Sequence, residues 1–428
     1  MAMKSVFWLV ASVALVARLV AAVTLDGFYH PYLEEWDLIA HNLLEGRGFT
    51  YPFHGIVYHS YIAPFSAWVS AASYWLTGAI AGAMLLQIAA GVALAVVAAQ
   101  IAERLFGGWV GPFSTGLLVA VHPGLTVYSA SRSHSLAFDS LFFALALLQS
   151  FRIADRPTIG RALQFGLILG AGMLSRPTIV VFLPITALWL LVTAPRSTLW
   201  PLIKSCMVAG LCAAVIVAPW SIRNSLLHGR FVFMLTTDGE VFWRGNNPLA
   251  TGNSYIDSNT TVFGAMPAAE REDLLRQSTE LAQAGWFQAR SSAFIREHPG
   301  AFVRLTIRKF VQFWSFSAQT GVLYPRGWFQ LYMAYYVSVL ALAACGVWRL
   351  GRVRGRALVD TGLLAAFLLG LSVLQSFYYV ESRHRWAVES LVLVVSGGGV
   401  ALLWDLFGID RRGWRRVAQR PSVGRSAV

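Results

Sequence analysis

Ten apolar segments run along the chain, separated by short polar or basic loops. They cover residues 5–23, 79–102, 109–130, 136–151, 162–174, 178–192, 202–220, 328–348, 358–377 and 387–406. A helix needs about 20 apolar residues to cross a bilayer, so the shorter segments must extend into the residues that flank them. The pattern predicts an all-α polytopic integral membrane protein with about ten transmembrane helices.

One further apolar stretch, residues 61–76, is interrupted by serines and aromatic residues, and loop charge decides its status. The strongly basic loops are 152–161, 196–204, 349–356 and the tail 411–425, and basic loops stay in the cytoplasm. With Lys4 also inside, these loops share one side only if residues 61–76 do not cross. We therefore predict that this stretch is a helix in the outer leaflet and that both termini are cytoplasmic.

This topology divides the chain into four parts. Residues 1–220 form an N-terminal transmembrane module with its first outer loop at 24–76, residues 221–327 an extracytoplasmic subdomain, residues 328–410 the C-terminal transmembrane helices, and residues 411–428 a basic cytoplasmic tail. Within the subdomain, residues 298–316 alternate apolar and basic side chains at helical spacing. That pattern predicts a basic interfacial helix, with Lys309 off its apolar face.

The composition agrees with a membrane protein. Charged residues make up 13% of the chain, against about 25% in soluble domains, and the mean hydropathy is +0.57. The formal net charge of +13 does not indicate nucleic-acid binding, because the basic residues gather in short loops between spans. Cys206, Cys212 and Cys345 lie in apolar segments, where cysteine is a small packing residue, and their spacing indicates neither disulfides nor a metal site.

The first outer loop carries a cluster of acids. In residues 32–49, apolar side chains recur at helical spacing, which predicts a short amphipathic helix at the membrane surface. Glu34, Glu35 and Asp37 place three carboxylates within four residues, just outside the first span. Such crowding raises carboxyl pKa values, which suits a general base. The alternative interpretation is the solvated polar face of an interfacial helix.

Arginine is usually cytoplasmic in membrane proteins, so arginines on the outer side are informative. They are Arg132, Arg176, Arg223, Arg244, Arg383 and Arg385, each close to the end of a span. A single one is explained by snorkelling to the interface, but five loops that converge on one face favour an anionic ligand such as a phosphate. Other outer side chains suited to hydrogen-bond a phosphate or a sugar are His54, Tyr58, His59, Tyr128, His134, Asn246, Tyr378 and Tyr379.

Carboxylates, arginines and aromatic residues at membrane level fit one kind of reaction. A polyprenyl-phosphate-linked sugar would present its phosphate at this depth, with its lipid between helices. Arginine would stabilise the departing phosphate, and a carboxylate would take the proton of an acceptor hydroxyl. The alternatives are a polysaccharide polymerase or ligase that uses a lipid-pyrophosphate donor, and a non-enzymatic transporter or lipid flippase. The last expects mid-span charges and two related halves, and the sequence has few such charges and no internal repeat.

Four stretches carry a family resemblance. They are residues 35–49 (EWDLIAHNLLEGRGF), 174–178 (LSRPT), 219–224 with 243–252 (PWSIRN and WRGNNPLATG), and 382–386 (SRHRW). In this order they resemble bacterial glycosyltransferases of the GT-C type, in the dolichyl-phosphate-mannose-protein mannosyltransferase-like superfamily (glycosyltransferase family 39 and its relatives).

The resemblance implies a lipid-phosphate-sugar donor, inverting transfer on the outer face of the cell membrane, and an acidic catalytic residue in the first outer loop. By position this residue is Glu35, with Glu34 and Asp37 as neighbours that substitute for it. Arg383 and Arg385 fall in the donor-phosphate region. Further supporting groups are Arg132, Arg176, Arg223 and His59. The expected partners are the donor lipid, the bilayer, and an acceptor that is a glycan, a lipid or a protein.

The chain departs from the family pattern in two places. The second outer loop reads Arg132-Ser133-His134, where relatives often carry an acid, and the first loop has no Asp-x-Asp pair. A hard cation wants several oxygen ligands, so the sequence does not support a catalytic metal, and we expect no cofactor.

Overall fold

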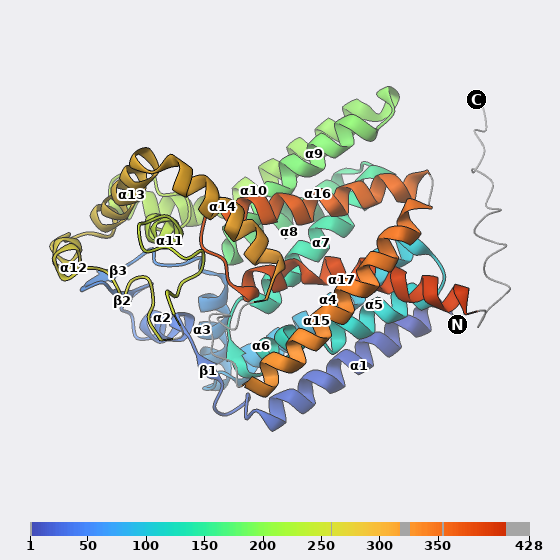
Figure 1. The fold of residues 1–428 in the computed structure, drawn as a ribbon, viewed down its shortest axis with the longest axis horizontal. Coiled ribbons are helices and arrows are strands. Elements are labelled where there is room, and N and C mark those ends of the chain that lie inside the picture. The colour runs from blue at the N-terminus through green and yellow to red at the C-terminus, as the bar shows by residue number, and fades with distance from the viewer. Residues whose placement is uncertain (1, 258, 317–325, 353–354, 408–428) are drawn as a thin grey trace.

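The computed structural model describes residues 2–257, 259–316, 326–352 and 355–407, and it is built almost entirely of helices (Figure 1). Every predicted apolar segment coincides with a helix or a pair of helices. These are α1 (Met3–Thr24), α4 (Ala81–Phe106), α5 (Val110–Ala120), α6 (Pro123–Ser131), α7 (Leu136–Asp155), α8 (Ile159–Ser175), η1 (Pro177–Val181) with α9 (Phe182–Thr193), α10 (Leu199–His228), α15 (Arg326–Gly351), α16 (Arg356–Ser376) and α17 (Ser382–Leu406). The predicted tail 411–428 lies outside the described residues.

Seven of the described helices are long and apolar enough to cross a membrane, and the bent pair of α5 and α6 makes eight. Helix α8 and the η1–α9 pair are apolar but shorter. The chain is therefore a multi-pass helical membrane protein, as the hydropathy pattern predicts.

The predicted span 109–130 is broken in its middle, where α5 and α6 meet at 51°. The cause is Pro123, which disfavours helical geometry in the residue before it, and His122 is accordingly extended. Breaking the helix leaves carbonyl groups of α5 without intrahelical partners. The buried Arg18 of α1 lies beside them, with Nη1 3.5 Å from the Ala120 carbonyl oxygen.

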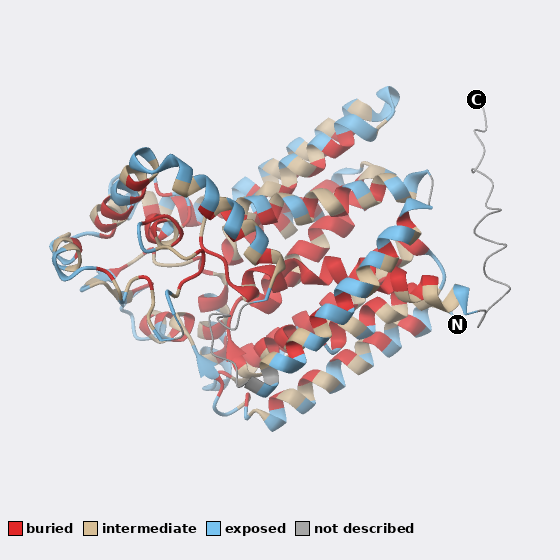
Figure 2. Ribbon diagram, in the orientation of Figure 1, coloured by how far each residue is buried: buried red, intermediate tan, exposed pale blue. Residues whose placement is uncertain are grey.

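Helix α17 is the centre of the membrane bundle, packed against α4, α5, α7 and α15 and buried along most of its length (Figure 2). Glycines let it approach α15 closely. A Cβ atom at Gly399 would lie 1.9 Å from the Leu342 carbonyl oxygen, and one at Gly346 would lie 1.9 Å from the Val395 carbonyl oxygen.

We expect Gly399→Ala to separate α15 from α17 and to destabilise the protein by roughly 1–3 kcal/mol or more, as overpacking does. Gly362→Ala in α16 is the matched control, because a Cβ atom there meets nothing within 4 Å. The melting temperatures of the two variants in detergent are measured by heating each protein and recording the fraction that remains monodisperse. Equal melting temperatures for the two variants would contradict the close packing.

The part of the chain predicted to be extracytoplasmic forms a small subdomain at one end of the bundle (Figure 1). It contains α11 (Asp238–Gly245), α12 (Ala268–Leu275), α13 (Glu280–Glu297) and α14 (Pro299–Trp314). Its own core is formed by Trp243, Val262, Met266, Leu274 and Phe287, with Trp286 at its edge. The predicted interfacial helix is α14, but Lys309 is buried in the structure and not on the open face.

The first outer loop folds into α2 (Glu35–Leu44) and α3 (Phe65–Thr77), with short strands between and beside them. Strands β2 (Tyr51–Phe53) and β3 (Ile56–Tyr58) form an antiparallel hairpin. Strand β1 (Tyr32–Leu33) pairs in parallel with β4 (Arg132–Ser133) and so joins the first outer loop to the second. Helix α3 has 13 residues, too few to cross a bilayer, in agreement with the non-crossing helix predicted at 61–76.

Candidate active site

The acids of the first loop stand at the start of α2. Glu34 is the extended residue that precedes the helix, and Glu35 and Asp37 lie in its first turn, where the exposed N–H groups favour negative charge. Together with Tyr32, Leu33, Leu38, Tyr51, Arg132 and Arg383 they line a cavity of about 430 Å³, which we call cavity 1.

Glu34 is held by the second outer loop. Its Oε1 accepts a hydrogen bond from Arg132 Nη1 at 3.0 Å, and its Oε2 lies 3.8 Å from His134 Nε2. Arg132 in turn lies over the rings of Tyr32 and Tyr128, with its guanidinium carbon 4.2 and 5.0 Å from their centroids. Burial lowers the pKa of His134 well below its usual value, with nearby Arg383 acting in the same direction, so the ring is neutral.

Burial also raises the pKa of Glu34 to about 7, against the opposing effect of Arg383 and Arg132. Between the usual value of 4.5 and this value, the folded protein keeps a proton that the unfolded chain has released. The contribution of Glu34 to stability therefore falls as the pH rises from about 4.5 to about 7.

We expect infrared difference spectra to show a protonated carboxyl band that disappears as the pH passes about 7 and is missing in Glu34→Gln. The melting temperature of Glu34→Gln should depend less on pH over this range than that of the wild type. A wild-type carboxyl band that is lost already near pH 4.5 would contradict the assignment.

Glu35 differs from its neighbours because none of the described residues forms a hydrogen bond or ion pair with its carboxylate. Asp37 is occupied: its Oδ1 accepts a hydrogen bond of 2.6 Å from the Tyr74 hydroxyl, and its Oδ2 lies 3.5 Å from His41 Nδ1. Of the three carboxylates, that of Glu35 is the one left to a bound molecule by the part of the chain that the structure describes.

Arg383 is the cation opposite these acids. It lies in the first turn of α17, and its Nε is 2.8 Å from Oε2 of Glu381, the residue that precedes the helix. Glu381 is buried and thereby fixes the guanidinium, whose other nitrogens form no ion pair with a described residue.

A second cavity of about 620 Å³, cavity 2, adjoins the same group of residues. Glu34, Glu35 and Arg383 line both cavities. Cavity 2 extends between the membrane bundle and the subdomain, and its wall includes the apolar run 231–235 after α10. Its other predicted site residues are Arg176, Arg244, His134, Tyr378 and Tyr379.

Two further arginines of cavity 2, Arg176 and Arg244, have acids beside them. Arg176 Nε lies 2.8 Å from Asp139 Oδ2, and Arg244 Nη2 lies 2.5 Å from Glu240 Oε1. The guanidinium carbon of Arg244 also lies 4.7 Å from the centre of the Tyr379 ring. Each of these two guanidinium groups is therefore held by a neighbouring acid, and one of these acids, Glu240, also lines cavity 2.

Arg385 and Asn246 are predicted site residues that lie outside both cavities, because the protein itself uses their side chains. Arg385 is fully buried, pairs with Glu389 at 3.1 Å and donates to the carbonyl oxygens of Phe313 and Ser315. Asn246 is also fully buried, donates to two carbonyl oxygens and accepts from Lys309 Nζ at 2.9 Å. Both side chains hold segments together.

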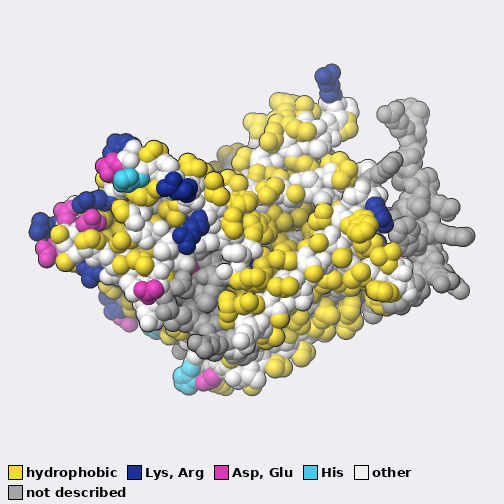
Figure 3. All heavy atoms as spheres, in the orientation of Figure 1, with side chains coloured by type: hydrophobic (Ala, Val, Ile, Leu, Met, Phe, Trp, Pro, Cys, Tyr) yellow, Lys and Arg dark blue, Asp and Glu magenta, His cyan; other side chains and the backbone are white. Residues whose placement is uncertain are grey.

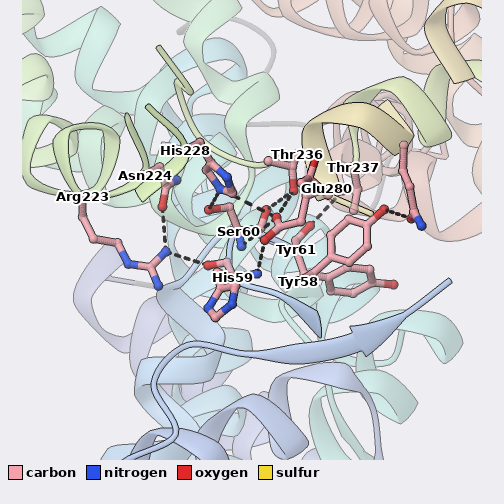
Figure 4. Close-up of polar contacts among 12 residues, drawn as sticks. Tyr58, His59, Ser60, Tyr61, Arg223, Asn224, His228, Thr236, Thr237 and Glu280 are labelled. Atoms are coloured by element: carbon pink, nitrogen blue, oxygen red, sulfur yellow. Dashed lines mark hydrogen bonds and ion pairs between the residues drawn. The ribbon is translucent and has the colours of Figure 1, made fainter. Parts of the chain in front are cut away.

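Tyr58, His59 and Arg223 lie in a separate network shown in Figure 4. The Glu280 carboxylate at the start of α13 accepts from the backbone N–H groups of His59 and Ser60. Arg223 Nη1 donates to the His59 carbonyl oxygen at 2.6 Å. The Tyr58 hydroxyl donates to Gln283, also in α13. This network connects the hairpin and the residues after it to the subdomain. The sequence predicted instead that these side chains bind phosphate or substrate.

Sequence reasoning missed several residues of the site, among them Glu381, Tyr32 and Tyr51. Glu381 stands two positions before Arg383, and an acid so close to an outer arginine is the signal that was available. Tyr32 and Tyr51 line cavity 1, but tyrosine is common at membrane interfaces and gives no specific signal. The described residues contain no group of three His, Cys, Asp or Glu side chains arranged to hold a metal ion.

Solved structures with the same fold define the class first. The archaeal oligosaccharyltransferase AglB from Archaeoglobus fulgidus, in complex with an inhibitory peptide and a dolichol-phosphate, matches with a TM-score of 0.58 and 10% identity over 99% of this chain. An Archaeoglobus fulgidus oligosaccharyltransferase tethered to an acceptor peptide matches with a TM-score of 0.55, 11% identity and 97% coverage. The chain spans 52% of the length of either protein. The fold is thus that of the GT-C membrane proteins.

A family model also matches part of the sequence. The model of the dolichyl-phosphate-mannose-protein mannosyltransferase family matches residues 61–222, which confirms the predicted resemblance. ArnT from Cupriavidus metallidurans bound to undecaprenyl phosphate is similar over 94% of this chain and 78% of its own, with 15% identity and a TM-score of 0.46. No curated protein sequence matches the chain.

Proposed function

We propose that the protein is a glycosyltransferase that moves a sugar from a polyprenyl-phosphate donor to an acceptor hydroxyl outside the cytoplasm. One observation carries the proposal: Glu35, whose carboxylate has no partner among the described residues, and the cation Arg383 both line the two cavities. A base and a phosphate-binding cation at the meeting point of two cavities are what a two-substrate transfer requires.

Cavity 2 suits the donor. Arg176, Arg244 and Arg383 supply positive charge, and the apolar run 231–235 supplies a surface for the first isoprene units. Cavity 1 suits the acceptor, because it opens beside Glu35 and is lined by polar and aromatic side chains. The sugar of the donor would lie between them, next to Glu34 and Glu35.

In this arrangement the acceptor oxygen attacks the anomeric carbon of the sugar from cavity 1. The new carbon–oxygen bond forms as the bond to the phosphate oxygen breaks on the opposite side, so the configuration inverts. Glu35 takes the proton of the acceptor hydroxyl. The electron pair of the broken bond stays on the phosphate, whose charge Arg383 stabilises. Glu34, paired with Arg132, holds the start of α2 in place.

The comparisons support this proposal at the level of the class. The matching family model is named for a mannosyltransferase with a dolichyl-phosphate-mannose donor, and the AglB structure contains a dolichol-phosphate. A lipid-pyrophosphate donor is the competing substrate class.

The test is binding of undecaprenyl lipids to the purified protein in nanodiscs, followed by native mass spectrometry. We expect retention of undecaprenyl phosphate over the neutral undecaprenol by about 100-fold, because only the phosphate meets the arginines of cavity 2. Equal retention of phosphate and alcohol would overturn the proposal. Stronger retention of the pyrophosphate than of the monophosphate would replace the donor class by the competing one.

A further inference from the structure

Helix α14 has a surface that the proposed reaction does not use. Val303, Ile307 and Val311 recur every four residues and are 54–60% exposed. Arg304 and Arg308 form a second exposed row directly beside them. A contiguous row of exposed apolar side chains, unlike a single one, is typical of a surface that contacts a protein partner or a membrane.

The inner side of the same helix is firmly attached to the protein. Leu305, Lys309 and Phe313 are buried. The Lys309 ammonium group donates to the Gly245 carbonyl oxygen at 3.1 Å and to Asn246 Oδ1 at 2.9 Å. The helix therefore keeps one orientation, and its exposed rows face outward permanently.

The two exposed arginines are not neutralised by the protein. Residues 299–314 contain no Asp or Glu, and no described acid forms an ion pair with Arg304 or Arg308. Two other arginines of the subdomain differ in this respect: Arg276 lies 3.8 Å from Glu272, and Arg290 lies 3.2 Å from Asp273.

The surface of α14 is also continuous with the membrane-facing surface. Helix α14 packs against α16, a candidate span whose Leu369, Val373 and Phe377 end is 40–52% exposed. Figure 3 shows hydrophobic side chains covering the membrane helices up to the α13–α14 region, where basic side chains join them. An apolar row next to a basic row, at the rim of a membrane-facing surface, is the arrangement of an interfacial helix.

We propose that α14 lies in the outer headgroup layer and that Arg304 and Arg308 bind the phosphates of anionic phospholipids. Val303, Ile307 and Val311 enter the boundary between headgroups and acyl chains. Since Lys309 and Asn246 connect α14 to the residues beside Tyr378, lipid binding here fixes the roof of cavity 2 relative to the bilayer.

The test places the photoreactive amino acid p-benzoylphenylalanine at position 307 of the full chain. The protein is reconstituted into nanodiscs of phosphatidylcholine with phosphatidylglycerol, irradiated, and the cross-linked lipid is identified by mass spectrometry. We expect lipid adducts in which phosphatidylglycerol is enriched over its bulk fraction by about 10-fold, from two basic residues near the headgroups.

The enrichment should disappear in Arg304→Gln/Arg308→Gln and persist in Arg304→Lys/Arg308→Lys. Arg276→Gln/Arg290→Gln removes the same charge from arginines that face acids and should leave the enrichment unchanged. Absence of lipid adducts at position 307, or enrichment that survives the Gln pair, would overturn the proposal. Neither result bears on undecaprenyl-phosphate binding, so the two proposals fail separately.

Discussion

Replacing Glu35 with glutamine is expected to lower the rate of sugar transfer by about 10²- to 10⁴-fold, the range that a positioned general base contributes. The carboxylate has no described partner, so its loss leaves no buried charge behind and the fold should persist. Donor binding should change little, because glutamine keeps the shape of the side chain. The measurement is the transfer rate under saturating donor, with retention of undecaprenyl phosphate as a second readout.

Glu45→Gln is the matched control for this experiment. Glu45 follows α2 in the same outer loop, is exposed and forms an ion pair with Arg47, and its replacement removes the same charge. If Glu35→Gln keeps full transfer activity while folding normally, Glu35 is not the base. Loss of activity in Glu34→Gln instead would assign the proton to its neighbour.

Replacing Arg383 with glutamine is expected to weaken retention of undecaprenyl phosphate by about 100-fold, as removal of one partner of a buried charge pair commonly does. Transfer should fall at least as far, because the same cation stabilises the departing phosphate. Arg383→Lys should restore little of it, since an ammonium group lacks the planar fork that contacts a phosphate with two nitrogens.

Arg383→Gln also leaves the buried Glu381 without its cation, so a loss of stability must be distinguished from a loss of phosphate binding. The double variant Arg383→Gln/Glu381→Gln removes both charges and should recover thermal stability without recovering lipid binding. Arg47→Gln, in the exposed pair with Glu45, is the control for loss of one outer positive charge. Normal phosphate retention in the double variant would show that Arg383 has only a structural role.

Hydropathy predicted the helices well because one property, the length of an apolar segment, determines whether a helix can span the membrane. The break at Pro123 was missed because residues 109–130 remain apolar throughout, and only the local geometry imposed by proline divides them. Helix α14 was found from its periodicity, yet Lys309 was placed on the wrong side. A lysine inside a helix can be buried when carbonyl and amide oxygens meet its ammonium group, and residue type does not report that.

The site was predictable in part, because residue type and the predicted side of the membrane can both be read from the sequence. Glu34, Glu35, Asp37, Arg132 and Arg383 were selected by residue type and side of the membrane, and the structure brings them to one cavity. Arg385 satisfied the same criteria and is only two residues from Arg383. On a helix such neighbours point in different directions, and the direction of Arg385 leads to Glu389 in the bundle. Loop charge therefore predicts which side of the membrane carries the site. Which arginine of that side faces the cavity depends on the rotation of the helix, which loop charge does not report.

The parallel pairing of Tyr32–Leu33 with Arg132–Ser133 has a consequence for engineering. The first and second outer loops depend on each other, because Glu34 follows strand β1 of the first loop and Arg132, which donates to its carboxylate, lies in strand β4 of the second. A chimera that takes only one of these loops from a relative would disrupt the β1–β4 pairing and the contact between Arg132 and Glu34. Exchange of acceptor preference between members of this fold should therefore succeed only when both loops are transplanted together.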